Sequence, residues 1–247
     1  MPGIKAAIKS LIPASILDRR AARIAGEKQK KFGDLSVADA FSEIYKQKAW
    51  GESGDTFFSG SGSEGSLAAE YARMVGSFIA ENHIKFVVDL GCGDMRVSEQ
   101  FITPEIAYVG CDVVPDIIEY HRQNSTLTNA DFRCLNIIED DLPDGDLCLI
   151  RQVLQHLSND EICRILAKAQ KFPYVIVTEH YPADGGLKEP NLDIPHGPGV
   201  RLQFDSAVVL DQPPFNVTDL ELLLDLEAER GTRIKSFLIK RRAVKLS

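Results

Sequence analysis

The segment VVDLGCGD, residues Val87–Asp94, is the part of the sequence from which the fold is best interpreted. It joins a short apolar run directly to a glycine-rich turn. Gly91 and Gly93 allow the backbone to turn sharply and a ligand to approach it closely, because glycine has no Cβ. In open α/β sheets, ligands bind at the carboxyl ends of the strands, where such a turn lies. We therefore expect a binding site at the end of this strand.

Further apolar runs, rich in β-branched residues, follow this strand and alternate with helical patterns. Their hydrophobicity is continuous, which indicates strands buried on both faces, as in a parallel sheet covered by helices. Two final runs flank Gly231-Thr232 and predict an antiparallel hairpin. We therefore predict an α/β fold, a Rossmann-like, seven-stranded, mostly parallel sheet with helices on both faces and a C-terminal antiparallel hairpin. The expected strands span residues 86–90, 107–113, 131–136, 147–152, 174–180, 221–229 and 233–242.

Apolar residues with helical spacing lie before and between these strands. Their spacing predicts helices over residues 37–50 and 66–82, ahead of the first strand. A later helix begins with Ser158 and Glu161, which have the spacing of a capping box. A loop rich in glycine and serine, with SGSGS at residues 59–63, connects the first two helices.

Composition and charge exclude several classes of protein. Of the 247 residues, 44% are hydrophobic, which is too many for a disordered chain. The formal net charge is -8, but residues 1–31 hold eight basic and two acidic side chains, against 20 and 34 in the rest. We therefore predict a basic arm, residues 1–35, and one domain, residues 36–247. Because the domain is acidic, we expect no nucleic-acid partner. The arm, through residues 1–31, is expected to make a peripheral membrane contact or an oligomer contact.

The cysteines and the apolar runs indicate the cellular compartment in which the protein is expected. Five cysteines without C-x-x-C spacing indicate neither a disulfide framework nor a zinc site. Free cysteines in apolar runs fit a reducing compartment, so we expect a cytoplasmic protein without a metal. No apolar run approaches the ~18 residues that span a bilayer.

Two acidic residues near the glycine turn indicate which ligand it holds. Asp112 lies nineteen residues after Gly93, at the end of the second strand, where a carboxylate can accept both hydroxyls of a ribose. A dinucleotide fingerprint would require glycine at the position of Arg96, so NAD is disfavoured. Asp89, two residues before the first glycine, suits a cationic ammonium group. A cofactor with an adenosine and a cationic amino-acid end is S-adenosylmethionine (SAM).

The segments DLGCGD and DLCLIRQVLQHLSND, together with Asp112, resemble those of class I SAM-dependent methyltransferases. The resemblance covers about residues 84–182, and it departs from the family at Asp94, where many members have a third glycine. It implies that the residues at the ends of the first four strands bind the cofactor. These are Asp89, Gly91, Cys92, Gly93, Asp112, Val113, Asn136, Ile137, Arg151 and Gln152.

Two histidines lie at the expected active edge of the sheet. His156 follows the fourth strand, and its near-neutral pKa suits a general base that removes a hydroxyl proton. A structural histidine that fastens the loop is the alternative. His180 closes the fifth strand and is a second catalytic candidate.

The predicted substrate-binding residues lie in loops. Trp50 belongs to the lead-in of the SGSGS loop, which we interpret as a lid over the cofactor; a flexible linker is the alternative. Tyr181 follows the fifth strand directly. Arg201 lies in a long insertion, residues 183–215, where it is expected to bind an anionic group of the acceptor.

The resemblance implies that a methyl group passes from SAM to a small-molecule acceptor. Oxygen is favoured as the accepting atom, because the N-P-P-[YF] segment typical of amino-group methylation does not follow the fourth strand. The lead-in segment with W-G and SGSGS resembles the corresponding segment of bacterial methyltransferases that act on a sugar, a glycan or a secondary metabolite. Two alternatives stay open: a catalytically inactive SAM-binding regulatory module, and an RNA methyltransferase that uses the basic arm.

Overall fold

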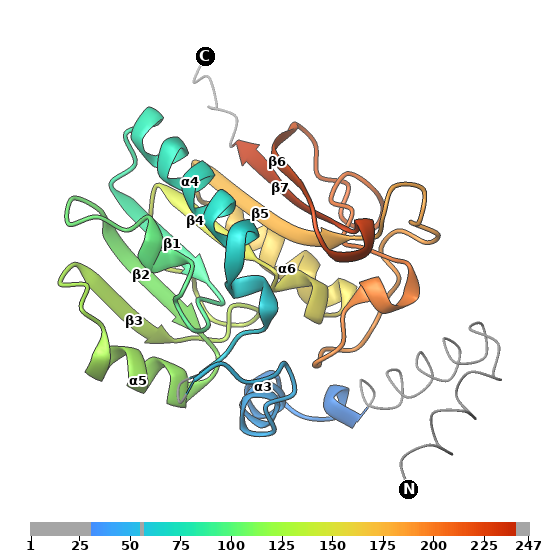
Figure 1. Cartoon of the computed structure of the whole chain (residues 1–247), viewed down its shortest axis with the longest axis horizontal. Helices are drawn as coiled ribbons and strands as arrows, with labels where there is room; N and C mark the ends of the chain where they lie inside the picture. Colours follow the sequence, from blue (N-terminus) through green and yellow to red (C-terminus); the bar gives the residue numbers. More distant parts are fainter. Residues whose placement is uncertain (1–30, 55–56, 241–247) are drawn as a thin grey trace, which may run out of the picture.

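Seven strands form one continuous sheet in the computed structural model, which describes residues 31–54 and 57–240 (Figure 1). The strand order is β3-β2-β1-β4-β5-β7-β6, with β1 to β5 parallel and β7 antiparallel to both of its neighbours. This arrangement confirms the predicted fold, including its C-terminal antiparallel hairpin. The strands are β1 (Phe86–Leu90), β2 (Ala107–Asp112), β3 (Ala130–Cys134), β4 (Leu147–Arg151), β5 (Tyr174–Tyr181), β6 (Leu220–Glu227) and β7 (Arg233–Lys240).

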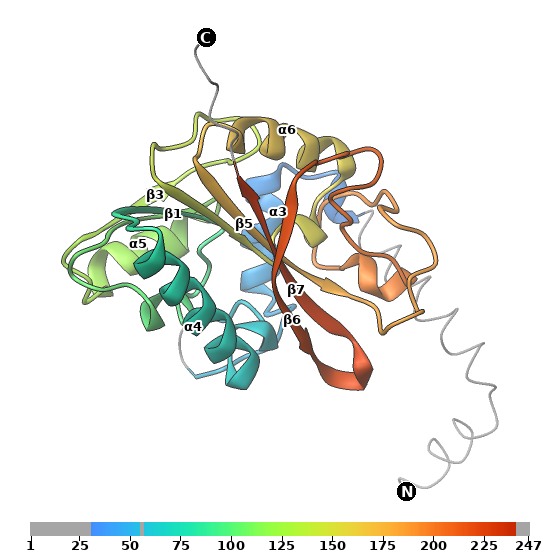
Figure 2. The ribbon, with the colours of Figure 1, turned by 90° about the horizontal axis from the view of Figure 1, so that it is seen from above.

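Helices cover both faces of the sheet (Figure 2). On one face lie α4 (Gly65–Glu81) and α5 (Pro115–Asn124), and on the other lies α6 (Asn159–Ala169). Successive strand residues point to opposite faces, so Val87 packs beneath α4 while Val88 packs beneath α6. Both are fully buried, which explains why these strands are apolar without interruption.

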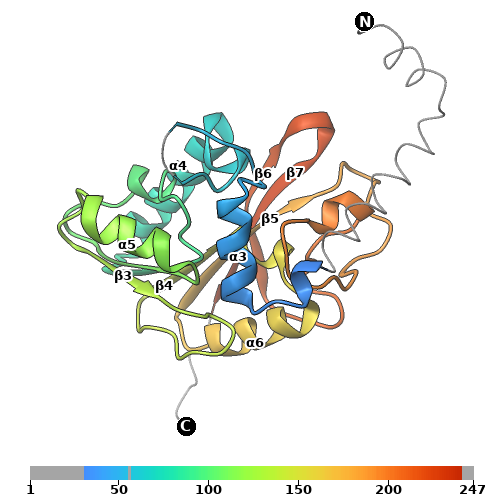
Figure 3. The ribbon, with the colours of Figure 1, turned by 90° about the horizontal axis from the view of Figure 1, so that it is seen from below.

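Helix α3 (Val37–Lys46) lies across the end of the sheet at which the parallel strands finish (Figure 3). Ser36 caps its first turn by accepting the N–H of Asp39 at 3.1 Å. The helix is four residues shorter than predicted, because the chain turns at Lys48, whose φ of 51° is left-handed. The turn carries Trp50 back towards the sheet.

The insertion between β5 and β6 is ordered by contacts with α6 and with the turn before it. Its only helical part among the described residues is a short 3-10 turn, Arg201–Phe204. Asp193 accepts the N–H of Asn159 at 2.8 Å, and Ile194 is buried. The insertion therefore packs against the main body of the fold and closes one side of the sheet end.

One prediction lies outside these observations. The basic arm falls almost wholly on residues 1–30, which are outside the described residues. Within 31–54 and 57–240, the helices are too short or too polar to cross a bilayer.

His196 links the insertion to two other elements. Its Nδ1 lies 2.7 Å from Oε1 of Glu161, and its Nε2 lies 3.1 Å from the carbonyl of Leu35. Both partners accept hydrogen bonds, so a protonated imidazolium satisfies both. The hydrogen bond to Glu161 raises the pKa of His196 from its ordinary value of 6.5.

We expect His196→Gln to lower the free energy of unfolding by about 1 kcal/mol at pH 6, and by less at pH 9. A raised pKa in the folded state stabilises the protein below the unfolded value of 6.5. This contribution is lost as the pH rises through the folded value. Urea denaturation of both proteins at the two pH values measures the difference. An equal loss at pH 6 and pH 9 would contradict a charged link.

Candidate functional site

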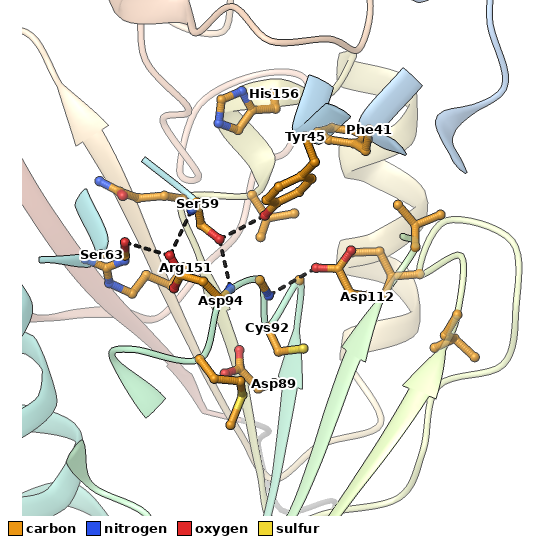
Figure 4. Close-up of a pocket in the computed structure, with 18 of the residues that line it drawn as sticks. Phe41, Tyr45, Ser59, Ser63, Asp89, Cys92, Asp94, Asp112, Arg151 and His156 are labelled. Carbon is orange, nitrogen blue, oxygen red and sulfur yellow. Dashed lines mark hydrogen bonds between the residues drawn. The ribbon is translucent and has the colours of Figure 1, made fainter. Parts of the chain in front are cut away.

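A cavity with an empty volume of about 970 Å³, including its open mouth, lies between the strand ends and α3. Figure 4 shows Asp89, Asp112 and Arg151 at the strand ends, while Phe41 and Tyr45 project from α3 on the opposite side. We call the strand-end side the floor and the α3 side the roof. The position agrees with the general rule for ligands of parallel sheets.

Two positions of the floor require glycine, because of their backbone conformation and because of the side chains close to them. Gly91 and Gly93 have φ values of 80° and 54°, in the left-handed region. A Cβ on Gly91 would lie 2.5 Å from Cγ2 of Val153, and a Cβ on Gly93 would lie 2.4 Å from Oγ of Ser59. The turn therefore brings bare backbone to the cavity wall.

Asp112 is held at the end of β2 by two backbone donors. The N–H of Gly93 donates to Oδ2 at 3.1 Å, and that of Val114 donates to Oδ1 at 3.0 Å. Burial raises the pKa of the carboxyl, while these hydrogen bonds and His121 oppose the rise. Each carboxylate oxygen has two acceptor positions, so Asp112 can accept two further hydroxyls from the cavity.

Asp89 is a second buried carboxylate of the floor. Its Oδ2 accepts the hydroxyls of Ser98 at 2.6 Å and Tyr108 at 2.8 Å. Burial raises the pKa of Asp89, whereas both hydroxyls and the nearby Arg151 oppose this. The carboxylate is therefore fixed in place, and a cationic ligand group beside it would favour its charged form.

Arg151 ends β4 with a buried guanidinium. It donates through Nη2 to the carbonyl of Gly62, and it lies over the ring of Tyr71, 5.0 Å from the centroid. Its Nε is buried and has no hydrogen-bond partner among the described residues. Because a buried donor without an acceptor is unfavourable, Nε is suited to an anionic or carbonyl group of a ligand.

His156 lies in the 3-10 turn Leu154–His156 and borders the roof. Its Nδ1 is 3.1 Å from the carbonyl of Gly199, which only accepts, so this nitrogen carries the proton in the neutral ring. Nε2 then carries the lone pair, and the side-chain Nε2 of Gln155 lies 3.4 Å from it. Burial lowers the pKa of His156 from 6.5 to about 4, so the imidazole is neutral at physiological pH.

Aromatic rings surround His156. The ring of Trp50 lies 5.0 Å from it and that of Phe41 lies 6.4 Å from it, between centroids. The indole Nε1 of Trp50 donates to the carbonyl of Pro198 at 3.1 Å, which ties this turn to the insertion. The roof is consequently apolar and uncharged around one titratable ring.

The cavity gathers most residues that the sequence singled out. All of the predicted cofactor-binding residues line it, as do His156 and Trp50. The predicted cofactor-binding residues in the cavity wall are Asp89, Gly91, Cys92, Gly93, Asp112, Val113, Asn136, Ile137, Arg151 and Gln152.

The structure does not bring His180 and Tyr181 to this cavity. The Nε2 of His180 lies 2.8 Å from Oγ1 of Thr232, in the turn before β7. The hydroxyl of Tyr181 donates to the carbonyl of Val208 at 2.6 Å. Both side chains thus contact the hairpin turn or the insertion.

Arg201, expected to bind an anionic substrate group, is also placed outside the cavity, and it is only 1% exposed. Its Nε donates to the carbonyl of Leu192, and its Nη1 to that of Leu154. Its Nη2 donates to the carbonyl of Leu157 at 2.7 Å and to Oδ1 of Asn159 at 2.9 Å. In this structure the guanidinium therefore joins the insertion to the turn that carries His156.

We expect Arg201→Lys to lower the free energy of unfolding by about 2–3 kcal/mol, because a single ammonium cannot reach all of these buried acceptors. Urea denaturation measures the loss. The matched control is Arg133→Lys on β3, half-exposed and paired only with exposed Asp131, which should change stability by about 0.5 kcal/mol or less. Equal stability of the two variants would show that the guanidinium contacts contribute little.

Several residues of the site were not found from the sequence. Phe41 and Tyr45 were assigned to the apolar stripe of a helix, a pattern that ordinary core residues share. Glu179 does not line the cavity, but it is buried on β5 and supports the turn that carries His156, where it accepts the N–H groups of Leu154 and Gln155 at 2.9 and 3.1 Å. Burial raises its pKa to about 8. A lone acid within the apolar run YVIVTEHY was the available signal.

The described residues contain no group of three or more His, Cys, Asp or Glu side chains arranged to hold a metal ion.

Comparison with known proteins relates this geometry to a family. Residues 88–172 match the family model of a methyltransferase domain. No curated protein sequence matches the chain.

Solved structures share the fold at low sequence identity. Human N-acetylserotonin methyltransferase, in complex with SAM, has a TM-score of 0.52 at 13% identity, over 92% of this chain and 67% of its own. The N-terminal domain of EvdMO1, solved in the presence of S-adenosylhomocysteine (SAH) and D-fucose, has a TM-score of 0.51 at 14% identity, over 84% and 98%. The bifunctional kinase-methyltransferase WbdD has a TM-score of 0.50 at 16% identity, over 72% and 40%.

Proposed function

We propose that this chain, in which residues 88–172 match a methyltransferase domain, transfers the methyl group of SAM to a hydroxyl oxygen of a small, uncharged acceptor. The family assignment confirms the resemblance seen in the sequence. One observation carries the proposal. The charged groups of the cavity are confined to its floor, while its roof presents aromatic and aliphatic side chains around His156.

The floor fits the cofactor in its chemistry. Asp112 would bind the ribose hydroxyls, because both of its oxygens have acceptor positions left after the backbone bonds. Arg151 would bind the carboxylate of the amino-acid end through its unpartnered Nε. Asp89 would face the ammonium group, and Val113 and Ile137 would pack on the adenine.

The roof favours an acceptor without charge. It consists of Val37, Phe41, Tyr45 and Trp50, with Leu157 beside His156. Burying a charged group against such side chains without an ion partner would be costly. A flat apolar face that also carries a hydroxyl is complementary to these rings, and both sugars and many secondary metabolites present one.

His156 supplies the proton acceptor. When bound, the cofactor supplies an electrophilic methyl group on a positively charged sulfur. Nε2 of His156 would accept the proton of the acceptor hydroxyl while that oxygen receives the methyl group and SAH is left. The Gly199 carbonyl keeps the Nδ1 proton in place, so that Nε2 carries the lone pair, and the acceptor hydroxyl would replace the long 3.4 Å contact that Nε2 makes with the Gln155 amide. Positioning of the two reactants contributes the larger part of the rate.

The proposal that the acceptor is a sugar or a secondary metabolite is based on the shape and polarity of the cavity. The substrates named for the similar structures belong to those proteins, which share 13–16% identity with this chain.

We expect the purified protein to bind SAH and Asp112→Asn to weaken that binding roughly tenfold or more, because the ribose loses part of its acceptor pair. Isothermal titration calorimetry measures the affinity, and Asp131→Asn, on an exposed edge of β3, is the control for charge. Transfer of labelled methyl to sugar and phenolic acceptors then tests turnover. SAH binding without transfer would favour a regulatory module. Salt-sensitive methylation of RNA would favour the RNA enzyme.

We expect His156→Gln to lower kcat about 10²–10⁴-fold while SAH affinity is retained, because the residue acts on the acceptor proton. Since the pKa of His156 is about 4, the wild-type rate should stay constant from pH 8 down to about pH 6. A pH–rate profile with saturating substrates measures this. His83→Gln, at an exposed position after α4, is the control. A fall in kcat with a midpoint near 6.5 would contradict the buried-base assignment.

A further inference from the structure

We propose that Asp94 is a positioning residue that fastens the loop of residues 57–64 over the glycine turn and thereby closes the cofactor site. The inference rests on the proposed use of the cavity by SAM. Asp94 occupies the place where many family members have a glycine, and its side chain is 5% exposed.

Asp94 and Ser59 bind each other through both backbone and side chain. The N–H of Ser59 donates to Oδ2 of Asp94 at 2.8 Å, and the N–H of Asp94 donates to Oγ of Ser59 at 2.9 Å. The Ser63 hydroxyl shares its proton between the same Oδ2, at 3.0 Å, and the carbonyl of Gly60 within the loop, at 2.8 Å. A glycine at this position would keep only the bond made by its N–H. The carboxylate is therefore a direct link between the loop and the floor (Figure 4).

The fastened loop also reaches α3. The hydroxyl of Tyr45 lies 2.8 Å from Oγ of Ser59, so this one serine joins the roof, the loop and the glycine turn. Ser59, Ser63 and Tyr45 all line the cavity. Position 59 is thus part of the cavity wall, and its placement depends on Asp94.

At Gly62 the loop lies directly against the side chain of Gln152, so that a larger residue there would have to displace this amide. A Cβ on Gly62 would lie 2.1 Å from Oε1 of Gln152, while the Gly62 carbonyl accepts from Nη2 of Arg151. This contact adds a second attachment, from the end of β4. A loop that only passed over the site as a linker would not require such closeness.

Arg96 supports the same loop two residues further on. Its guanidinium donates to the hydroxyl of Ser53 at 2.8 Å and to the carbonyl of Ser53 at 2.7 Å, and it pairs with Glu64. It also lies over the ring of Phe58, 5.3 Å from the centroid. Asp94 and Arg96 are the two positions at which glycine-rich fingerprints would place a glycine. Here both side chains hold the loop.

The fastened loop would keep the cofactor in its site. With the loop held down, its backbone covers the glycine turn, which excludes water from the reacting groups and slows dissociation. Releasing the loop should therefore weaken cofactor binding even though the floor is unchanged.

The test is a double-mutant cycle on SAH affinity with Asp94→Asn and Ser63→Ala. Asp94→Asn keeps the size of the side chain but removes a charged acceptor, and we expect the Kd for SAH to rise roughly tenfold. Ser63→Ala should raise it less. Because both changes break the same link, the double variant should resemble Asp94→Asn alone. Asp131→Asn is again the control for charge, and thermal unfolding establishes that each variant is folded.

Hydrogen exchange of the peptide that contains residues 57–64 gives a readout that does not need the cofactor. We expect faster exchange in Asp94→Asn than in the wild type, whose Ser59 N–H is held by the carboxylate. Unchanged exchange, or fold-changes in Kd that multiply in the double variant, would overturn the proposal. A wild-type protein that binds no SAH would refute the proposed function instead, and the exchange result would still decide whether Asp94 holds the loop.

Discussion

Two backbone hydrogen bonds, donated by the N–H groups of Gly91 and Cys92 to the carbonyl of Cys111, organise the site. They are 2.8 and 3.0 Å long and join the turn after β1 to the last residues of β2. The next N–H along the turn, that of Gly93, consequently reaches the carboxylate of Asp112. The parallel pairing of β1 with β2 thus determines both where the bare backbone lies and where the carboxylate of Asp112 points.

The fold could be predicted from the sequence because its determinants are local. Strands buried on both faces are apolar throughout, and the helices between them repeat their apolar residues every three or four positions. The end of α3 was less predictable. The pattern of residues 37–50 continues to Trp50, but the left-handed turn at Lys48 ends the helix at Lys46. Such turns depend on tertiary contacts, here the packing of Trp50 against His156.

The floor of the site was predictable for a similar reason, since its residues lie at strand ends, and strand ends are adjacent in a parallel sheet. The roof was not, because its contacts join segments far apart in sequence: Trp50 with Pro198, and His156 with Gly199. Arg201 shows the limit most clearly. A charged residue in a long loop suggests a ligand contact, but the carbonyls around it need donors, and the sequence does not reveal where they lie.

The attachment of His156 to the insertion has a consequence for how the domain can diverge. The same segment holds Trp50 of the roof through the Pro198 carbonyl and sets the tautomer of His156 through the Gly199 carbonyl. Under the proposed function, a change in its length or path would therefore alter both the acceptors that fit beside Trp50 and the nitrogen that takes up their proton. The floor belongs to other strands and would be untouched. Acceptor choice and turnover would thus vary together as such domains diverge, while affinity for the methyl donor would vary separately.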